Sequence, residues 1–192
     1  DNGVAWLAAK QNPDGSWGSW YPIAQTALAV LKLAEHAVDA KYGYGLPSPF
    51  DPGNPYREDM ENGLNYIFLK ASVISIDNEN AGNPDNNGNG KGVYFSSTPW
   101  TGHRTYETSI AMMAIAASRA PDRVVNVPGS PVDNWKYKDV LQDAVDYLAW
   151  GQTDFGGGRG GWYYNESVEG WSSDQSNSGW AVFGLGFAES PA

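Results

Sequence analysis

Three polar residues of this 192-residue chain have the side chains that general acid–base chemistry requires. His103 and Glu107 stand four positions apart, so a helical turn would place them on one face. An imidazole oriented by a carboxylate can act as a general base, and Asp174 could supply an acid. The competing interpretation, which these residue types favour, is that Glu107 and Asp174 are helix caps or first-turn acids and that His103 is merely exposed.

A second set of residues favours ligand binding. They lie where the chain leads into three apolar segments, and we expect the starts of these segments to converge at one end of a helical array. Helix N-termini present free N–H groups that suit an acidic or hydroxylated ligand, and aromatic rings can stack on sugars. The candidate ligand-binding residues are Tyr21, Gln25, Trp100, Arg104, Tyr106, Trp162, Trp171 and Asn177.

The segment 85–90 is a candidate calcium loop. Asp85, Asn87 and Asn89 stand at alternate positions and Gly90 follows them, which matches the first half of an EF-hand loop. The bidentate Glu expected at the twelfth position is replaced by Ser96, so another residue would have to complete the site. A flexible Asn- and Gly-rich turn explains the same pattern equally well. A calcium ion here would stabilise a long loop rather than perform chemistry.

The elements that must position these residues form an internal repeat. An amphipathic segment beginning at Gly3 returns at Ala144 and, more weakly, at Gly63. Each copy is followed by an almost wholly apolar segment with small residues at its second and fourth positions, as in 26–31, 108–113 and 178–183. Such segments favour buried helices that approach their neighbours closely. The pattern predicts an all-α single domain of three helical hairpins, with units at about 1–40, 58–120 and 137–190.

The first unit carries a family resemblance. Its Gly3, Trp6, Leu7, Gln11, Gly15 and Trp17 stand at the spacing of the QW repeat of squalene and oxidosqualene cyclases. The third unit keeps Gln152 and closes with Trp162, whereas the middle unit has Ala71 in place of the Gln. The chain thus resembles the terpenoid-cyclase and protein-prenyltransferase superfamily. That resemblance implies a partial or shortened α/α toroid in which the Gln caps a helix end and the Trp packs over it.

The chemistry of that superfamily has no counterpart in this sequence. The resemblance would require an Asp-x-Asp-Asp acid cluster, an Asp-Asp-x-x-Asp magnesium motif, or a zinc site that includes Cys, and the chain contains none of these. The absence of Cys also excludes disulfides and thiol nucleophiles. Cyclase and prenyltransferase activity is therefore disfavoured, and further repeats or a partner chain would be needed to complete a toroid.

Composition limits the remaining partners. Twelve basic and twenty-two acidic residues give a formal charge of −10, which repels nucleic acid and anionic lipid. No apolar stretch is long enough to span a bilayer. The sequon at Asn165 is compatible with an extracellular or cell-surface location, and we expect the chain to be a mature fragment or an excised domain.

Three functions remain open. We expect a non-catalytic module that binds a carbohydrate or another small molecule, with Ca²⁺ as the possible cofactor. The alternatives are a polysaccharide lyase or hydrolase that uses His103, Glu107 and Asp174, and a structural domain that binds another protein.

Overall fold

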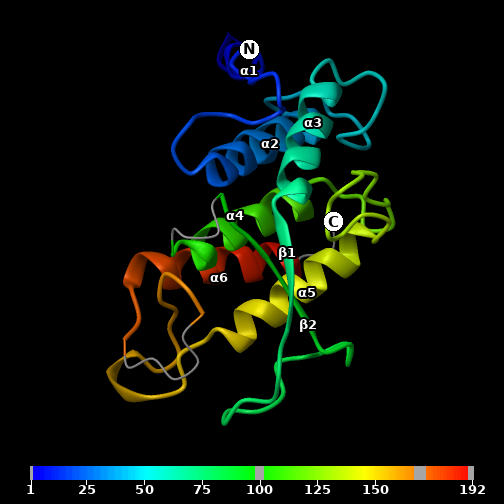
Figure 1. Ribbon diagram of the computed structural model, residues 1–192. Helices are drawn as coiled ribbons and strands as arrows, with labels where there is room; N and C mark the ends of the chain where they lie inside the picture. Colours follow the sequence, from blue (N-terminus) through cyan, green and yellow to red (C-terminus); the bar gives the residue numbers. More distant parts are fainter. Residues whose placement is uncertain (1, 98–101, 167–171, 190–192) are drawn as a thin grey trace.

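The chain folds into three consecutive helix pairs joined by long connections (Figure 1). The computed structural model describes residues 2–97, 102–166 and 172–189. Within them lie α1 (Asn2–Ala8), α2 (Pro22–Val38), α3 (Arg57–Leu69), α4 (Arg104–Ala117), α5 (Tyr137–Trp150) and α6 (Gln175–Glu189), together with a short 3₁₀ turn, Gly156–Gly158. The prediction of a mainly helical fold is confirmed.

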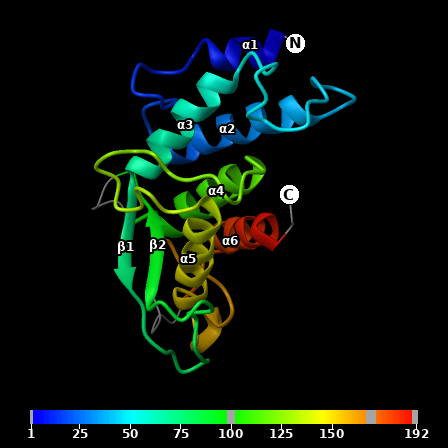
Figure 2. The ribbon, with the colours of Figure 1, turned by 90° about the vertical axis from the view of Figure 1, so that its right-hand side faces the viewer.

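The second helices of the three pairs, which we call the central helices, pack in a row with α4 in the middle. Helix α4 packs against α2 on one side and against α6 on the other, and Figure 2 shows it between them. Helix α3 packs on α2, and α5 lies beside α4 and α6. Close packing of α4 with α6 depends on small residues, because Gly184 of α6 lies directly against the backbone of Ser109.

The central helices differ in how far they are buried. Almost every residue of α4 is enclosed, as its apolar sequence predicts. Helix α6 is equally apolar, but Val182 and Phe183 are 60% and 59% exposed. Helix α6 therefore presents an apolar face to solvent, where the sequence pattern predicts burial on all sides.

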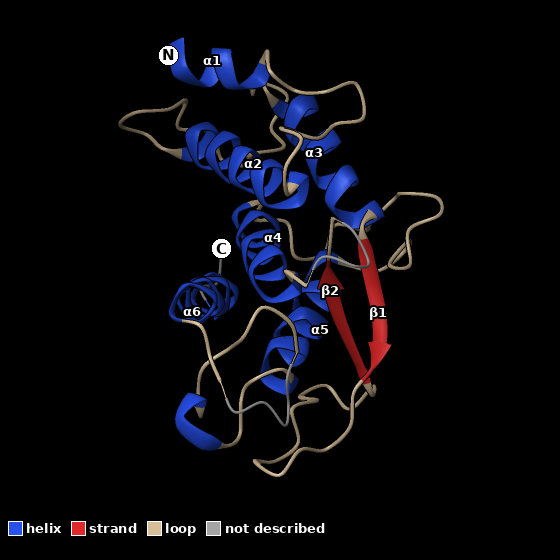
Figure 3. Cartoon of the chain, turned by 60° about the vertical axis from the view of Figure 1, so that its left-hand side comes forward, coloured by secondary structure: helices blue, strands red, loops and turns tan. Residues whose placement is uncertain are grey.

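The long connection in the middle unit contains a β-hairpin, which the sequence interpretation missed. Strand β1 (Ala71–Ser75) pairs antiparallel with β2 (Lys91–Phe95), with Val73 opposite Val93 (Figure 3). Strand β2 packs against α5, where the rings of Tyr94 and Tyr147 lie 5.4 Å apart. The strands are short and separated by an Asn- and Gly-rich tip, so their pairing depends on this tertiary contact. The strictly all-α prediction is thus corrected.

The two Trp residues that close the first and third units make the same hydrogen bond. The indole Nε1 of Trp17 donates to the carbonyl of Leu7 over 2.7 Å, and that of Trp162 donates to the carbonyl of Leu148 over 2.7 Å. Each bond satisfies a carbonyl near the end of the preceding helix. Both rings are buried, which removes Trp162 from the candidate ligand-binding residues: a ring that is 6% exposed cannot stack on a ligand.

The two Gln residues of the motif also behave alike. The side-chain amide of Gln11 donates to the carbonyl of Gly15, and that of Gln152 donates to the carbonyl of Gly160, both over 2.9 Å. Gln11 makes a second bond of 2.8 Å to the carbonyl of Asp59 in the next unit. These side chains hold the turn between helix and connection, as expected for scaffold residues.

A third hydrogen bond recurs in all three units, including the middle one. A hydroxyl in the first part of each central helix accepts the backbone N–H of the aromatic residue that closes the connection. The pairs are Thr26 with Trp17 (2.9 Å), Thr108 with Phe95 (3.0 Å) and Ser178 with Trp162 (2.9 Å). Phe95 therefore occupies in the middle unit the position that Trp holds in the other two.

Candidate functional site

Five aromatic rings gather at the N-terminal ends of α2 and α4. The imidazole of His103 is in edge-on contact with the rings of Tyr21, Tyr106 and Tyr164, at centroid distances of 4.7, 6.0 and 5.4 Å. Tyr163 lies edge-on to Tyr164 at 5.2 Å. Tyr21 and Tyr164 are 37% exposed and Tyr163 is 42% exposed, so the group forms a solvent-facing aromatic surface. We call these five residues the His103 surface.

Tyr21 connects the first unit to the second within this surface. Its phenol oxygen lies 3.1 Å from Nε2 of His103. Tyr21 stands immediately before α2 with φ 51° and ψ 55°, a left-handed conformation that is unfavourable for a bulky side chain. Such a conformation persists only where surrounding contacts hold it, and residues of this kind cluster at ligand-binding sites.

Backbone contacts bring the helix ends together beneath the rings. The N–H of Thr105, in the first turn of α4, donates to the carbonyl of Tyr164 over 3.1 Å. The N–H of Ile23, in the first turn of α2, donates to the hydroxyl of Ser97 over 3.3 Å. The start of α4 thus meets the connection that leads to α6, and the start of α2 meets the connection that leads to α4.

Glu107 lies in the core, in the first turn of α4. Its side chain is fully buried, and its two carboxylate oxygens accept hydrogen bonds from the hydroxyl and the N–H of Ser97. Burial raises the pKa of Glu107, although the bonds from Ser97 oppose the shift. Among the described residues, no hydrogen bond joins this carboxylate to His103, so the proposed His–Glu pair is not formed.

Asp174 has the geometry of a helix cap. Its carboxylate accepts the backbone N–H and the side-chain amide of Asn177, both over 2.8 Å, at the start of α6. These two bonds lower the pKa of Asp174, because they stabilise the charged carboxylate. Asn177 is itself buried, and its Oδ1 has no partner among the described residues. Both residues therefore stabilise the start of α6, which agrees with the interpretation of Asp174 as a helix cap.

Arg104 belongs to a polar network next to the His103 surface. Its guanidinium pairs with the carboxylate of Glu166 and lies 4.6 Å from the centre of the Tyr94 ring. Glu166 also accepts the phenol O–H of Tyr147 over 2.7 Å. The network ties α4, β2 and α5 to the connection before α6, so Arg104 contributes mainly to positioning.

Of the remaining predicted ligand-binding residues, the structure describes only Gln25. Gln25 is exposed and lines a shallow groove together with Trp6 and Leu28. Trp100 and Trp171 lie outside the described residues. The sequence interpretation missed Tyr163 and Tyr164, for which the signal was an aromatic doublet directly after Trp162.

The candidate calcium loop lies at the tip of the hairpin, against α5. Both carboxylate oxygens of Asp85 accept backbone N–H groups of its own loop, including that of Gly90 at 2.7 Å. The side-chain amides of Asn87 and Asn89 donate to Asp143 of α5, at 2.6 and 3.0 Å. Within the described ranges, no group of three His, Cys, Asp or Glu side chains has the geometry to hold a metal by itself. A cation here would need amide or carbonyl oxygens as well.

Comparison with known proteins gives no assignment. No family model, no curated protein and no solved structure matches this chain. Of the helices that the structure describes, none has both the length and the apolar character to cross a membrane. Function must therefore be argued from the geometry of the chain itself.

Proposed function

We propose that this chain is a non-catalytic ligand-binding module, and that the His103 surface binds a hydroxylated ring compound such as a saccharide. The observation that carries the proposal is the convergence of four partly exposed rings from three segments of the chain: Tyr21, His103 and the pair Tyr163–Tyr164. Phenol and imidazole groups offer both an apolar face for a sugar ring and hydrogen-bonding atoms for its hydroxyls.

Two further features support binding rather than catalysis. Glu107 and Asp174 are both engaged in hydrogen bonds that stabilise the scaffold, so a lyase or hydrolase mechanism would lack its carboxylates. The left-handed backbone of Tyr21 is explained by a requirement to hold its ring against His103. An extracellular or cell-surface location would suit a saccharide ligand and remains part of this proposal.

The test is direct binding to a panel of neutral and acidic oligosaccharides, measured by calorimetry and by thermal melting. We expect at least one oligosaccharide to bind, and we expect His103→Ala and Tyr164→Ala to weaken its binding at least tenfold. Tyr42→Ala is the matched control, because Tyr42 is 66% exposed and lies elsewhere on the surface. Binding that survives both substitutions would contradict the site, and cleavage of the bound sugar would contradict the non-catalytic assignment.

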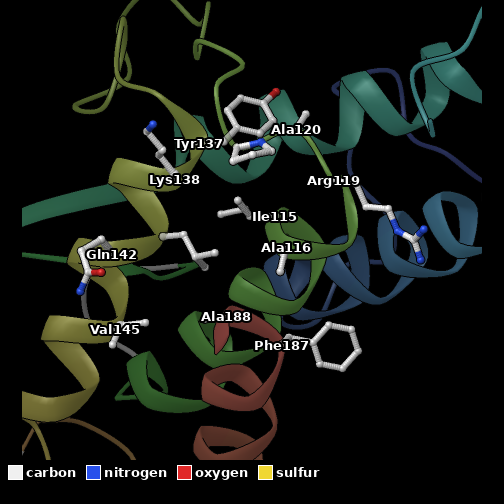
Figure 4. Close-up of a pocket in the computed structure, with 12 residues that line it drawn as sticks. Ile115, Ala116, Arg119, Ala120, Tyr137, Lys138, Gln142, Val145, Phe187 and Ala188 are labelled. Atoms are coloured by element: carbon white, nitrogen blue, oxygen red, sulfur yellow. The ribbon is translucent and has the colours of Figure 1, made fainter. Parts of the chain in front are cut away.

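A second candidate function is binding of a protein partner or of further repeats along α6. A groove of about 360 Å³ lies between α4, α5 and α6 and is lined by Ile115, Leu141 and Phe187 (Figure 4). It adjoins the helix that exposes Val182 and Phe183. Apolar surface of this extent marks interaction sites, and an additional helical hairpin of a toroid would cover it. Val182→Ser with Phe183→Ser, tested by size-exclusion chromatography, would abolish any self-association that uses this face.

A further inference from the structure

The loop at the tip of the β-hairpin packs over two buried carboxyl groups of helix α5. Asp143 and Asp146 stand three residues apart on the same face of α5, and each is only 1% exposed. The loop that begins at Asp85 covers them. Asn87 and Asn89 reach across to Asp143 from a part of the sequence more than fifty residues away.

Asp146 is the member of this cluster whose charge is least satisfied. One carboxylate oxygen accepts the side-chain amide of Gln142 over 2.9 Å. The other, Oδ2, is enclosed by protein and has no hydrogen-bond partner within the described residues. The backbone of Asn86, in the loop that begins at Asp85, interacts with this carboxyl, so Asp146 lies beside the loop.

Burying an unpaired carboxylate is costly, and the cost rises when like charges lie beside it. Asp143 accepts the side-chain amides of Asn87 and Asn89, whereas Asp146, three residues further along the same helix, accepts only that of Gln142. Lys91 is the cation that acts on Asp143, and its ammonium group lies 5.0 Å from the centre of the Trp135 ring. One lysine leaves an excess of negative charge in a site that is rich in oxygen atoms.

We propose that this cluster is a calcium site in which the loop 85–90 supplies one half of the ligands and Asp143 and Asp146 of α5 supply the other. The alternate spacing of Asp85, Asn87 and Asn89, with Gly90 at φ 70°, matches the first six positions of a calcium loop. The carboxylates of α5 replace the bidentate Glu that the sequence lacks at Ser96. Rotation of the two Asn amides by half a turn would direct their oxygens, in place of their N–H₂ groups, toward the ion.

The functional consequence is that calcium fixes the hairpin on α5. Strand β2 packs on this helix. Ser97, which follows β2, contacts both the start of α2 and Glu107 beneath the His103 surface. The ion would therefore stabilise the connection that supports the ligand-binding end. This inference does not depend on the identity of any saccharide ligand, because calcium binding is measured on the chain alone.

The test is titration of the chelator-treated protein with CaCl₂, followed by calorimetry and by thermal melting, with MgCl₂ as the comparison ion. We expect one ion to bind with a Kd of roughly 0.1–1 mM, the range of calcium sites in extracellular modules. At saturating calcium, the melting temperature should rise by on the order of 5 °C. A matching response to magnesium would overturn the assignment to calcium, since Mg²⁺ demands a smaller octahedral site.

Two substitutions locate the site and one controls for charge. Asp85→Asn and Asp146→Asn each remove one ligand charge without changing shape, and each should weaken calcium binding at least tenfold. Asp139→Asn makes the same change at an exposed position on α5 and should leave binding unaltered. Without calcium, Asp146→Asn should melt at or above the temperature of the parent protein, because a buried repulsion is relieved. The proposal is overturned if no saturable binding occurs, or if both ligand variants bind as tightly as Asp139→Asn.

Discussion

The phenol oxygen of Tyr21 lies 3.1 Å from Nε2 of His103, although 82 residues separate them in the chain. This contact joins the first helix pair to the second at the solvent-facing end of the molecule. It also explains why Tyr21 adopts a left-handed backbone conformation at the start of α2. Local strain therefore falls on a residue of the proposed binding surface.

Replacing Tyr21 by Asn should separate binding from stability. Asn tolerates the left-handed conformation better than Tyr does, which offsets the loss of the ring contacts with His103 and Tyr106. We expect the free energy of unfolding in urea to change by less than about 1 kcal/mol, whereas oligosaccharide binding should fall at least tenfold. If unfolding and binding weaken in parallel, Tyr21 is only a structural residue.

Replacing Glu107 by Gln should leave the fold intact, because the amide can still accept the N–H of Ser97 and meet its hydroxyl. A raised folded-state pKa means that the native state holds its proton more tightly than the unfolded chain, so the wild-type protein loses stability as pH rises through that pKa. The Gln variant lacks this loss, and urea unfolding at pH 7 should show equal or greater stability.

Glu107→Ala is the informative comparison. It leaves the N–H of Ser97 without its acceptor and should cost about 1–3 kcal/mol in the same assay. Ligand binding should persist in Glu107→Gln at the wild-type level. If the protein proves to have an enzymatic activity and Glu107→Gln loses most of it, the catalytic interpretation of Glu107 would be restored.

The two motif Trp residues should differ in their contribution to stability. Trp17→Phe and Trp162→Phe each remove the indole N–H that donates to a helix-end carbonyl, at Leu7 and Leu148. We expect Trp162→Phe to lower the unfolding free energy by about 1–3 kcal/mol, the cost of an unsatisfied buried acceptor, and Trp17→Phe to cost less, because the carbonyl of Leu7 also accepts the N–H of Lys10. Trp20→Phe is the control at a site that is 76% exposed, and it should change stability by less than about 0.5 kcal/mol.

The contact between α4 and α6 can be tested with one methyl group. A Cβ at Gly184 would stand 2.8 Å from the carbonyl oxygen of Ser109, so Gly184→Ala should cost about 1–3 kcal/mol through overpacking. Gly179 lies on the same helix, and a Cβ there meets no atom within 4 Å. Gly179→Ala should therefore raise stability by up to about 1 kcal/mol. Equal effects of the two changes in thermal melts would contradict this packing.

His36 should make stability sensitive to mild acid. It is 3% exposed, and burial lowers its pKa, with the nearby Lys32 adding to the shift and Asp39 opposing it. Below about pH 6.5 the unfolded chain binds a proton that the folded state resists, so stability falls as pH decreases.

Comparison with His36→Gln isolates this contribution from the titration of carboxylates. As pH falls from 6.5 toward the lowered pKa of His36, the wild type should lose up to about 1.4 kcal/mol of unfolding free energy per pH unit relative to the variant. Urea unfolding at several pH values measures this shift. Parallel pH curves for the two proteins would show that His36 has the same pKa in the folded and unfolded states, which would contradict this prediction.

The sequence by itself determined the helices and their repetition. Hydrophobic periodicity depends on neighbouring residues, so the apolar segments at 26–31, 108–113 and 178–183 predicted α2, α4 and α6. The equivalence of Thr26, Thr108 and Ser178 was also visible as a sequence alignment, and it returns as three equivalent hydrogen bonds. A toroid-like arrangement remains a proposal, supported by this repetition and by the exposed face of α6.

Only the tertiary structure decided which polar residues meet. Residue type alone could not show that Glu107 faces Ser97 rather than His103, because the direction of a side chain on a buried helix depends on distant packing. The same reason applies to the hairpin, whose short strands require support from α5. It applies also to Asp143 and Asp146, which had no recognisable motif and gain significance only because the loop 85–90 folds over them.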